Sequence, residues 1–388
     1  MEIASSTRSD QFGILVPYCL GLADPASNRQ NLERARASFD SVSAEQTMVL
    51  VHTIMETVDD IDLIKLMVTR MLHSFSKALN RVHRPFSRDV PFIEQQVDRN
   101  DSIQDTLELL KPMVTHLNRG TLSEAQRQTC RALLMKLQEY TEQYTAKEHI
   151  LFPIVEHHIV ESRCVQLMWA IHDDIRITIR DLKGLWDTPD VSRSELNKLF
   201  GKLFFDMKSM VFREEQVLFP VILDRIPKQA LMELSQDQHA DEQVSTSDER
   251  VSDEQVNLIT GNPTVRQLIQ IFNALPVDLT LVDADDRVVY FNTPGHRIFP
   301  RTKAVIGRSV QHCHPPKSMH IVQQILDAFR SKERTEAEFR ITVGGRYIRI
   351  TYTAIYNDAG SYAGTLEVSQ DISDLRKLTG EKRLLHWK

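Results

Sequence analysis

The stretch Lys147–Val155 reads KEHILFPIV, and it recurs at Glu214–Ile222 as EEQVLFPVI. Two copies of the pattern E-x-[IV]-L-F-P predict two similar helices. In each copy an acidic residue, Glu148 or Glu215, stands four positions before a phenylalanine and therefore shares a helix face with it. A carboxylate is thus directed at least partly toward the core in both helices. A plainer interpretation is also open: each glutamate serves solubility, and Phe-Pro ends or kinks a helix.

A histidine lies between the two copies, where the segment MWAIHDDIR places His172 on a further apolar helix face. Acidic and imidazole side chains from three helices indicate an inward-facing metal site in a helical bundle, with Glu148, His172 and Glu215 as its ligands. If two of these helices reverse near Val160, Glu148 and His172 each lie twelve residues from the turn, about 18 Å along the axis. Counted from a turn near Asp190, Glu215 lies seven residues farther than His172, so its level matches less well.

Length and composition limit the class of protein. At 388 residues the chain is long enough for two or three domains, and its 41% hydrophobic residues are enough to form real cores. The formal net charge of −6 gives no basic excess, so no nucleic-acid partner is expected. The sequence contains no run of about eighteen apolar residues and no secretory leader, so we expect a cytoplasmic protein without a membrane partner. The four cysteines form no C-x-x-C pair and signal neither a disulfide framework nor a thiolate zinc site.

The first part of the chain reads as a series of helices. Ser43 and Gln46 fit a capping box at the start of one of them, and residues 61–79 carry apolar side chains at helical spacing. Farther along, short polar connections between long helices imply an up-and-down bundle. Its helices are predicted at 91–118, 123–157, 161–185 and 192–224.

The last third of the chain changes to a strand pattern. It follows an acidic, polar segment that cannot bury enough apolar surface to fold alone and is therefore predicted to be a linker. Two strands, small helices and a three-stranded meander predict an α+β fold with an antiparallel sheet. The strands are predicted at 277–282, 288–292, 335–343, 346–357 and 363–371, with helices at 265–275 and 318–330.

The helical motifs KEHILFPIVEHH, MWAIHDDIR and REEQVLFP resemble those of prokaryotic proteins with three parts: an N-terminal helical domain of unknown function, a hemerythrin-type HHE cation-binding bundle and a PAS domain. The resemblance spans nearly the whole chain. It implies a multidomain protein in which an all-α N-terminal region with a hemerythrin-like four-helix bundle precedes an α+β PAS domain. The expected parts are the N-terminal helical domain at 11–85, the bundle at 88–228, the acidic linker at 229–261, the PAS domain at 262–376 and a C-terminal tail at 377–388.

Motifs in the last third of the chain resemble the PAS domain of these proteins. The motifs PRT at 300–302, IGR at 306–308 and VQHCHPPKS at 310–318 are similar to the PAS form found after such bundles, and GTLEVSQDI at 364–372 is similar to its last strand and exit. The resemblance implies a domain that senses small molecules or dimerises, so a homodimer through this domain is one expectation. Such domains are rarely catalytic.

In the family that these motifs resemble, the bundle holds a non-haem, usually di-iron, centre. The resemblance therefore implies that Glu148, His172 and Glu215 are metal ligands in this chain. This sequence departs from the family pattern in two places. Residues 90–93 read VPFI where H-P-x-H is usual, and residues 143–144 read QY where a histidine precedes the K-E pair. Because a di-iron site needs about six protein ligand contacts, a mono-metal bundle and a metal-free bundle stay open beside the di-iron one.

A second candidate cofactor site lies in the PAS part, where the motif CHPP places Cys313 beside His314. Thiolate and imidazole are both ligands of metals and of haem. One hypothesis is therefore haem binding or redox sensing by Cys313 or His314. The alternative is that CHPPKS is a rigid turn leading into a helix capped by Ser318.

These observations lead to a functional expectation. The motifs of nucleotide-binding, lipase-type and zinc-protease enzymes do not occur, and we expect no enzyme. We expect a cytoplasmic sensory protein whose bundle detects oxygen, nitric oxide or redox state at non-haem iron and is coupled to a PAS sensor or relay domain. Its partners would be a diatomic gas or redox molecule and a downstream signalling protein that the sequence does not identify. The alternatives are an iron enzyme that reduces nitric oxide or peroxide, a metal-free interaction scaffold, and a haem sensor acting through the PAS domain.

Overall fold

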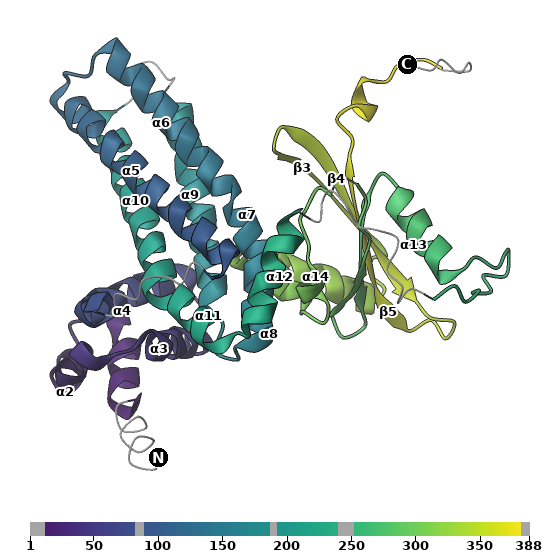
Figure 1. Cartoon of the computed structure of the whole chain (residues 1–388), viewed down its shortest axis with the longest axis horizontal. Coiled ribbons are helices and arrows are strands. Elements are labelled where there is room, and N and C mark those ends of the chain that lie inside the picture. Colours follow the sequence, from purple (N-terminus) through teal and green to yellow (C-terminus); the bar gives the residue numbers. More distant parts are fainter. Residues whose placement is uncertain (1–11, 82–88, 187–191, 240–251, 296, 382–388) are drawn as a thin grey trace. The chain divides into compact units, whose positions relative to one another are not determined.

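The computed structural model describes residues 12–81, 89–186, 192–239, 252–295 and 297–381. The chain divides after Gln236 into two compact units. Across the described ranges, the first unit contains only helices, and the strands belong to the second (Figure 1). This order confirms the prediction of an all-α region followed by an α+β domain.

The N-terminal part of the first unit consists of short helices followed by two longer ones. Ser43 begins the first of the longer helices as predicted: its hydroxyl accepts a hydrogen bond from the Gln46 N–H, and the Gln46 side chain accepts one from the Ser43 N–H. The second longer helix buries one apolar face, again as the spacing predicts. The elements are residues 12–20, η1 (Gly21–Ala23), α2 (Arg29–Ala35), η2 (Arg36–Ser41), α3 (Ala44–Thr57) and α4 (Ile61–Arg81).

Four long helices form the bundle: α5 (Pro91–Arg119), α6 (Glu124–Glu142), α9 (Cys164–Trp186) and α10 (Arg193–Arg213). Helix α5 packs against α6 and α10, and α9 packs against the same two helices. The four run alongside one another in Figure 1. Each helix therefore has two neighbours around a shared core, which is the arrangement expected of an up-and-down bundle.

Two π-helical turns interrupt helices that the sequence predicts as continuous. The N–H of Phe152 donates to the carbonyl of Lys147, five residues earlier, and the N–H of Phe219 donates to the carbonyl of Glu214. The predicted helical spans 123–157 and 192–224 agree with the observed ones, 124–158 and 193–225, but each contains a π turn that the sequence did not predict, and the first also has a turn at Gln143. The segments are α7 (Tyr144–Ala146), η3 (Lys147–Leu151) and α8 (Phe152–His158) in the first copy of the repeat, and η4 (Glu214–Leu218) and α11 (Phe219–Arg225) in the second.

Proline explains both turns. Pro153 and Pro220 each stand at the start of the helical segment that follows a π turn. Proline has no N–H to donate, and its ring clashes with the carbonyl four residues earlier, so the backbone widens to hydrogen bonds that span five residues. Turn η4 packs against α3 and α4, so the second turn lies where the bundle meets the N-terminal helices.

Helix α12 (Lys228–His239) follows the bundle and occupies the first part of the predicted linker at 229–261. Leu231 and Leu234 on this helix are buried, which gives the segment an apolar face despite its polar composition. Residues 240–251 of the predicted linker, and 382–388 of the predicted tail, lie outside the described residues. Among the helices of the described ranges, none has the length and apolar content of a membrane span.

The second unit is built on a five-stranded antiparallel sheet with the strand order β2-β1-β5-β4-β3. The first strand pairs with the last over its whole length, and helix α14 packs against β5. This topology confirms the predicted α+β fold. The elements are α13 (Val265–Ala274), β1 (Asp278–Asp283), β2 (Val288–Phe291), η5 (Lys303–Val305), η6 (Val310–Cys313), η7 (Pro316–Ser318), α14 (Met319–Arg330), β3 (Glu336–Val343), β4 (Arg346–Tyr356), β5 (Tyr362–Asp371) and η8 (Leu375–Lys377).

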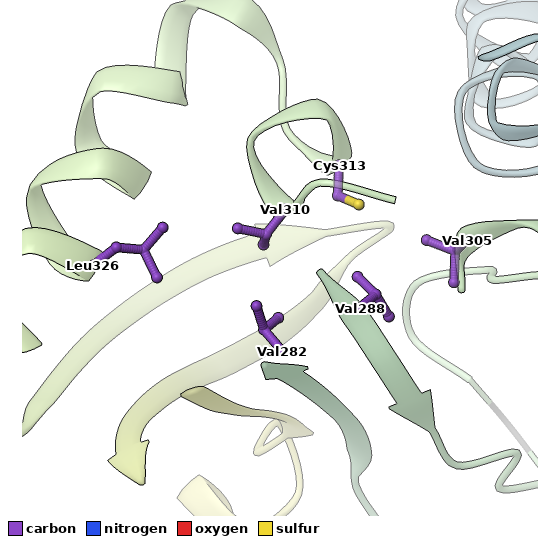
Figure 2. Packing of buried hydrophobic residues seen from close by; sticks show 6 residues of the cluster. All are labelled: Val282, Val288, Val305, Val310, Cys313 and Leu326. Atoms are coloured by element: carbon purple, nitrogen blue, oxygen red, sulfur yellow. The ribbon is translucent and has the colours of Figure 1, made fainter. Parts of the chain in front are cut away.

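A cluster of buried apolar side chains joins the sheet to the segments that cross it. Figure 2 shows these side chains gathered between the strands, the short η segments and α14. The removal of their apolar surface from water stabilises this end of the unit. The cluster contains Val282, Val288, Val305, Val310, Cys313 and Leu326.

Candidate functional site

The interior of the bundle contains a connected group of polar side chains, which we call the polar cluster. Its members come from α5, from α7 and the turn η3, from α9 and from the turn η4, and neighbouring members are joined by hydrogen bonds, ion pairs or ring contacts. Such a group inside an apolar core needs full charge and hydrogen-bond compensation to be stable. The polar cluster consists of Asn100, Tyr144, Lys147, Glu148, His172, Arg176 and Glu214.

A buried ion pair links the two copies of the sequence repeat. The Nζ atom of Lys147 lies 2.7 Å from both carboxylate oxygens of Glu214, and these two side chains are 3% and 0% exposed. Asn100 on α5 donates a further hydrogen bond of 3.0 Å to Oε2 of Glu214. Lys147 and Glu214 occupy equivalent positions in the two copies, directly before Glu148 and Glu215. The repeat therefore places opposite charges face to face in the core.

The second carboxylate of the cluster, Glu148, binds two side chains of α9. Its Oε1 lies 2.8 Å from Nδ1 of His172, and Arg176 binds both of its oxygens at 2.9 Å. Burial alone would raise the pKa of Glu148, but the hydrogen bonds from His172 and Arg176, with the charge of Arg176, hold that pKa at about 2. Glu148 is therefore ionised at neutral pH, and it is paired with a cation from the same protein.

His172 is held between aromatic rings. The ring of Tyr144 stacks on the imidazole at a centroid distance of 3.9 Å and an interplanar angle of 4°, and Phe152 lies parallel on it at 5.9 Å. Burial lowers the pKa of His172, although the hydrogen bond to Glu148 opposes this effect. The neutral ring donates from Nδ1 to the carboxylate, and its Nε2 lone pair has no hydrogen-bond partner in the described part of the chain.

The structure brings together two of the three side chains expected to bind metal. Glu148 and His172 are in direct contact, but the buried glutamate of the second copy is Glu214 and not its neighbour Glu215. Glu215 is only partly buried, and burial raises the pKa of its carboxyl group. Four further members of the polar cluster were not found from the sequence: Asn100, Tyr144, Lys147 and Arg176. One sequence signal could have pointed to the buried ion pair: at the first position of the repeat, one copy has a lysine (Lys147) and the other a glutamate (Glu214).

These side chains do not fit a di-iron centre. Iron needs several deprotonated donors turned toward one point, whereas the two carboxylates of the polar cluster are already neutralised by Lys147 and Arg176. A divalent ion placed among them would leave excess positive charge in a low-dielectric interior. No group of three or more His, Cys, Asp or Glu side chains suited to a metal ion is found among the described residues. In this bundle the protein's own cations neutralise the buried carboxylates.

A cavity of about 270 Å³ lies in the second unit, between α14 and the sheet. The strands β1, β3, β4 and β5 all contribute to its wall. Most of the lining is apolar, which is typical of a site for a small molecule, and a few polar groups are placed within it. The apolar lining includes Val282, Val322, Ile325, Leu326 and Phe339, and the polar lining includes His314, Tyr352, Thr365 and Glu367.

Glu367 on β5 is the buried charge of this cavity. It is 7% exposed, and Nη2 of Arg301 lies 3.6 Å from its Oε1. The hydroxyl of Ser369 donates to the same oxygen over 3.4 Å. Both contacts are long and both involve Oε1, and no hydrogen bond to Oε2 is found within the described ranges. The carboxylate is therefore balanced in charge by Arg301 but incompletely hydrogen-bonded.

Cys313 and His314 have separate surroundings. The Cys313 thiol is a member of the apolar cluster in Figure 2 and donates to the carbonyl of Ser309 at 3.5 Å. His314 lines the cavity, and its Nδ1 lies 2.8 Å from the carbonyl of Val310. The helix after the CHPP motif begins at Met319, with Ser318 at its N-cap but without a side-chain capping bond. Ser318 therefore holds the expected N-cap position, but its side chain does not make the capping hydrogen bond.

The fold and these two sites define a class of protein: a helical unit with a charge-compensated bundle, followed by an α+β unit with a largely apolar cavity. Residues 75–222 match the family model of the hemerythrin HHE cation binding domain, and residues 268–373 match that of the PAS domain. The chain thus joins an N-terminal helical region, a hemerythrin HHE domain and a C-terminal PAS domain, as the motifs predicted. This combination supports a sensory or regulatory arrangement.

Two solved structures are similar to parts of the chain. One is the crystal structure of a C-terminal domain from Streptococcus mutans, which is 31% identical, covers 34% of this chain and 100% of its own length, and has a TM-score of 0.31. The other is the PAS domain of a protein from Colwellia psychrerythraea, which is 18% identical, covers 28% of this chain and 98% of its own length, and has a TM-score of 0.23. No curated protein matches the chain.

Proposed function

We propose that this chain is a cytoplasmic sensory protein whose PAS domain receives a small molecule in the cavity between α14 and the sheet. The observation that carries the proposal is this cavity of about 270 Å³, with Glu367 buried in its wall. An apolar cavity of about 150 Å³ is already large enough to bind benzene. The activity is binding and relay of a signal, not catalytic turnover.

The relay follows from the elements that line the cavity. One wall is α14, and the opposite wall includes β5, which leads into the exit turn η8. A molecule bound between them makes contacts with both walls and favours the arrangement in which those contacts are best. Binding thereby shifts α14 relative to the end of the sheet, where a downstream protein can respond.

Filling the cavity tests this function. In the full chain, indole should slow hydrogen exchange in α14, since a bound molecule favours the packed state of the helix. Val322→Trp places an indole ring where the ligand would lie, and this variant should lose the effect. Ile271→Trp, on an exposed position of α13, is the matched control and should keep it. Equal protection in the V322W variant and in the wild type would show that the cavity is not the receiving site.

Gas or redox sensing at non-haem iron in the bundle is a second candidate function. One observation favours it: the buried Nε2 atom of His172 has no partner among the described residues. The opposing observation is stronger, because Lys147 and Arg176 already neutralise both carboxylates of the polar cluster.

Iron analysis tests this second candidate. We expect the anaerobically purified full chain to contain far less than one iron atom per molecule and to show no iron-oxo absorption band. Chelators should leave its melting temperature unchanged, and His172→Ala should not alter the iron content. One or two iron atoms per chain that are lost in the H172A variant would instead establish the iron site.

A further inference from the structure

We propose that the PAS cavity binds a neutral, largely apolar molecule that donates a hydrogen bond from an N–H or O–H group to Glu367. This inference rests on the proposed function and adds the chemical class of the ligand. It follows from the hydrogen-bonding state of the polar groups that line the cavity.

Two of the lining residues, Glu367 and His314, each have an acceptor atom for which no hydrogen bond is found among the described residues. The first is Oε2 of Glu367, which receives no hydrogen bond from the described residues, whereas Oε1 has the contacts with Arg301 and Ser369. The second is His314. Burial lowers the pKa of His314 and favours its neutral form. A carbonyl can only accept, so Nδ1 donates to Val310 and Nε2 keeps its lone pair. A single donor on the ligand supplies a hydrogen bond to one of them, and the charged carboxylate of Glu367 is the stronger acceptor of the two.

The hydroxyl group of Tyr352 is the third polar group of the lining, and it can pair with a donor or with an acceptor. Burial raises the pKa of the Tyr352 phenol, which therefore keeps its proton and can donate or accept. Its ring packs edge-on against Phe339, with the centroids 6.0 Å apart. The cavity therefore has a polar end at Glu367, His314 and Tyr352.

The rest of the cavity wall determines the polarity and size of the remainder of the ligand. It is made of aliphatic side chains from α14 and β1 and of the Phe339 ring. These side chains offer dispersion and hydrophobic contacts but no hydrogen bonds, so the ligand must be apolar away from its donor. The cavity volume is suited to a molecule of one or two fused rings or of similar bulk.

Charge balance favours a neutral ligand. Arg301 lies 3.6 Å from Glu367 and already supplies the positive charge that this buried carboxylate needs. A cationic ligand would lose its own hydration without a free counter-charge, and an anionic ligand would be placed beside Glu367. A neutral donor avoids both costs and completes the hydrogen bonding of the carboxylate.

Three related probes test the inference on the full chain by isothermal titration calorimetry. Indole has one N–H donor, 1-methylindole has nearly the same shape without the donor, and indole-3-carboxylate adds a negative charge. We expect indole to bind at least about tenfold more tightly than either of the others, because a hydrogen bond to a buried charged acceptor is a strong one.

A variant tests whether Glu367 is the residue that accepts the ligand's hydrogen bond. Glu367→Leu removes the acceptor and should make the affinities for indole and 1-methylindole equal. Glu338→Gln changes an exposed carboxylate on β3 and should leave the preference for indole intact. Because E367L also leaves Arg301 without its partner and can fail to fold, the comparison of the three probes on the wild-type chain is decisive alone.

The outcomes separate this inference from the proposed function. If indole and 1-methylindole bind equally well to the wild type, the donor requirement is wrong while the cavity remains a binding site. Tighter binding of indole-3-carboxylate than of indole would overturn the neutral class. If none of the three probes binds, both the ligand class and the receiving role of the cavity are wrong.

Discussion

Replacing Lys147 by methionine is expected to destabilise the helical unit by about 3–5 kcal/mol, which is the usual effect of breaking a buried ion pair by removing one partner. The Lys147 ammonium contacts both oxygens of Glu214, and neither side chain is exposed enough for water to take its place. In the variant, the hydrogen bond from Asn100 is the one that Glu214 keeps among the described residues. It must then take up a proton or admit water into the core, and either change lowers the free energy of unfolding.

The measurement is urea unfolding of the full chain followed by far-ultraviolet circular dichroism. Lys147→Met combined with Glu214→Gln should recover most of the lost stability, because the glutamine is neutral and still accepts from Asn100. Lys208→Met is the control for loss of a lysine at an exposed pair: Lys208 lies 2.6 Å from Glu108, and both side chains are about half exposed. That variant should change stability by less than about 1 kcal/mol.

One result would contradict this interpretation of the bundle. If K147M unfolds at the same urea concentration as the wild type, the Lys147–Glu214 pair does not compensate the buried charge. The same conclusion would follow if the double variant were no more stable than K147M alone. In either case the polar cluster would not be neutralised by the protein's own cations.

The repeat explains how much of the bundle could be predicted. Duplicated E-x-[IV]-L-F-P motifs indicated two similar helices, and equal residue counts from one turn placed Glu148 and His172 at one level, where their side chains do meet. Both inferences use the regular geometry of the α-helix. The pairing of Glu148 with His172 holds although Glu148 lies in the π turn η3.

In the second copy of the repeat the prediction failed for a physical reason. Glu148 and Glu215 hold the same position in their π turns, yet only Glu148 is buried. In the second copy Glu214 is the buried carboxylate, and the Lys147 ammonium lies 2.7 Å from both of its oxygens. Phe-Pro was recognised as a kink signal, but the consequence for the neighbouring charges appears only when the packed structure shows which side chains face inward.

The PAS part shows a similar division between local and long-range features. Alternating strands and turn residues predicted the meander, since those patterns depend on neighbours in sequence. The cavity depends on contacts between β1, α14 and β5, which lie far apart along the chain. The CHPP motif drew attention to Cys313, whereas the charged group of the cavity is Glu367, one of several acidic residues in strands.

Gly364→Ala is expected to destabilise the PAS unit by about 4 kcal/mol, since it adds both backbone strain and a steric clash. Gly364 has a φ of +152°, a value that residues with a side chain rarely adopt. A Cβ atom at this position would lie 2.2 Å from the carbonyl oxygen of Val282 on the neighbouring strand β1. Relief requires β1 and β5 to separate where they pair, since Gly364 is opposite Asp283.

The position of this glycine connects stability to ligand binding. Thr365 and Glu367 follow it on β5, and both line the cavity together with Val282. Hydrogen exchange measured on the full chain should therefore rise in β1 and β5 of the G364A variant, and indole should lose affinity. Gly261→Ala is the control, because its Cβ would meet open space and its stability should change by less than about 0.5 kcal/mol. Wild-type exchange rates in β1 and β5 of G364A would show that the close approach of the two strands does not hold this wall of the cavity together.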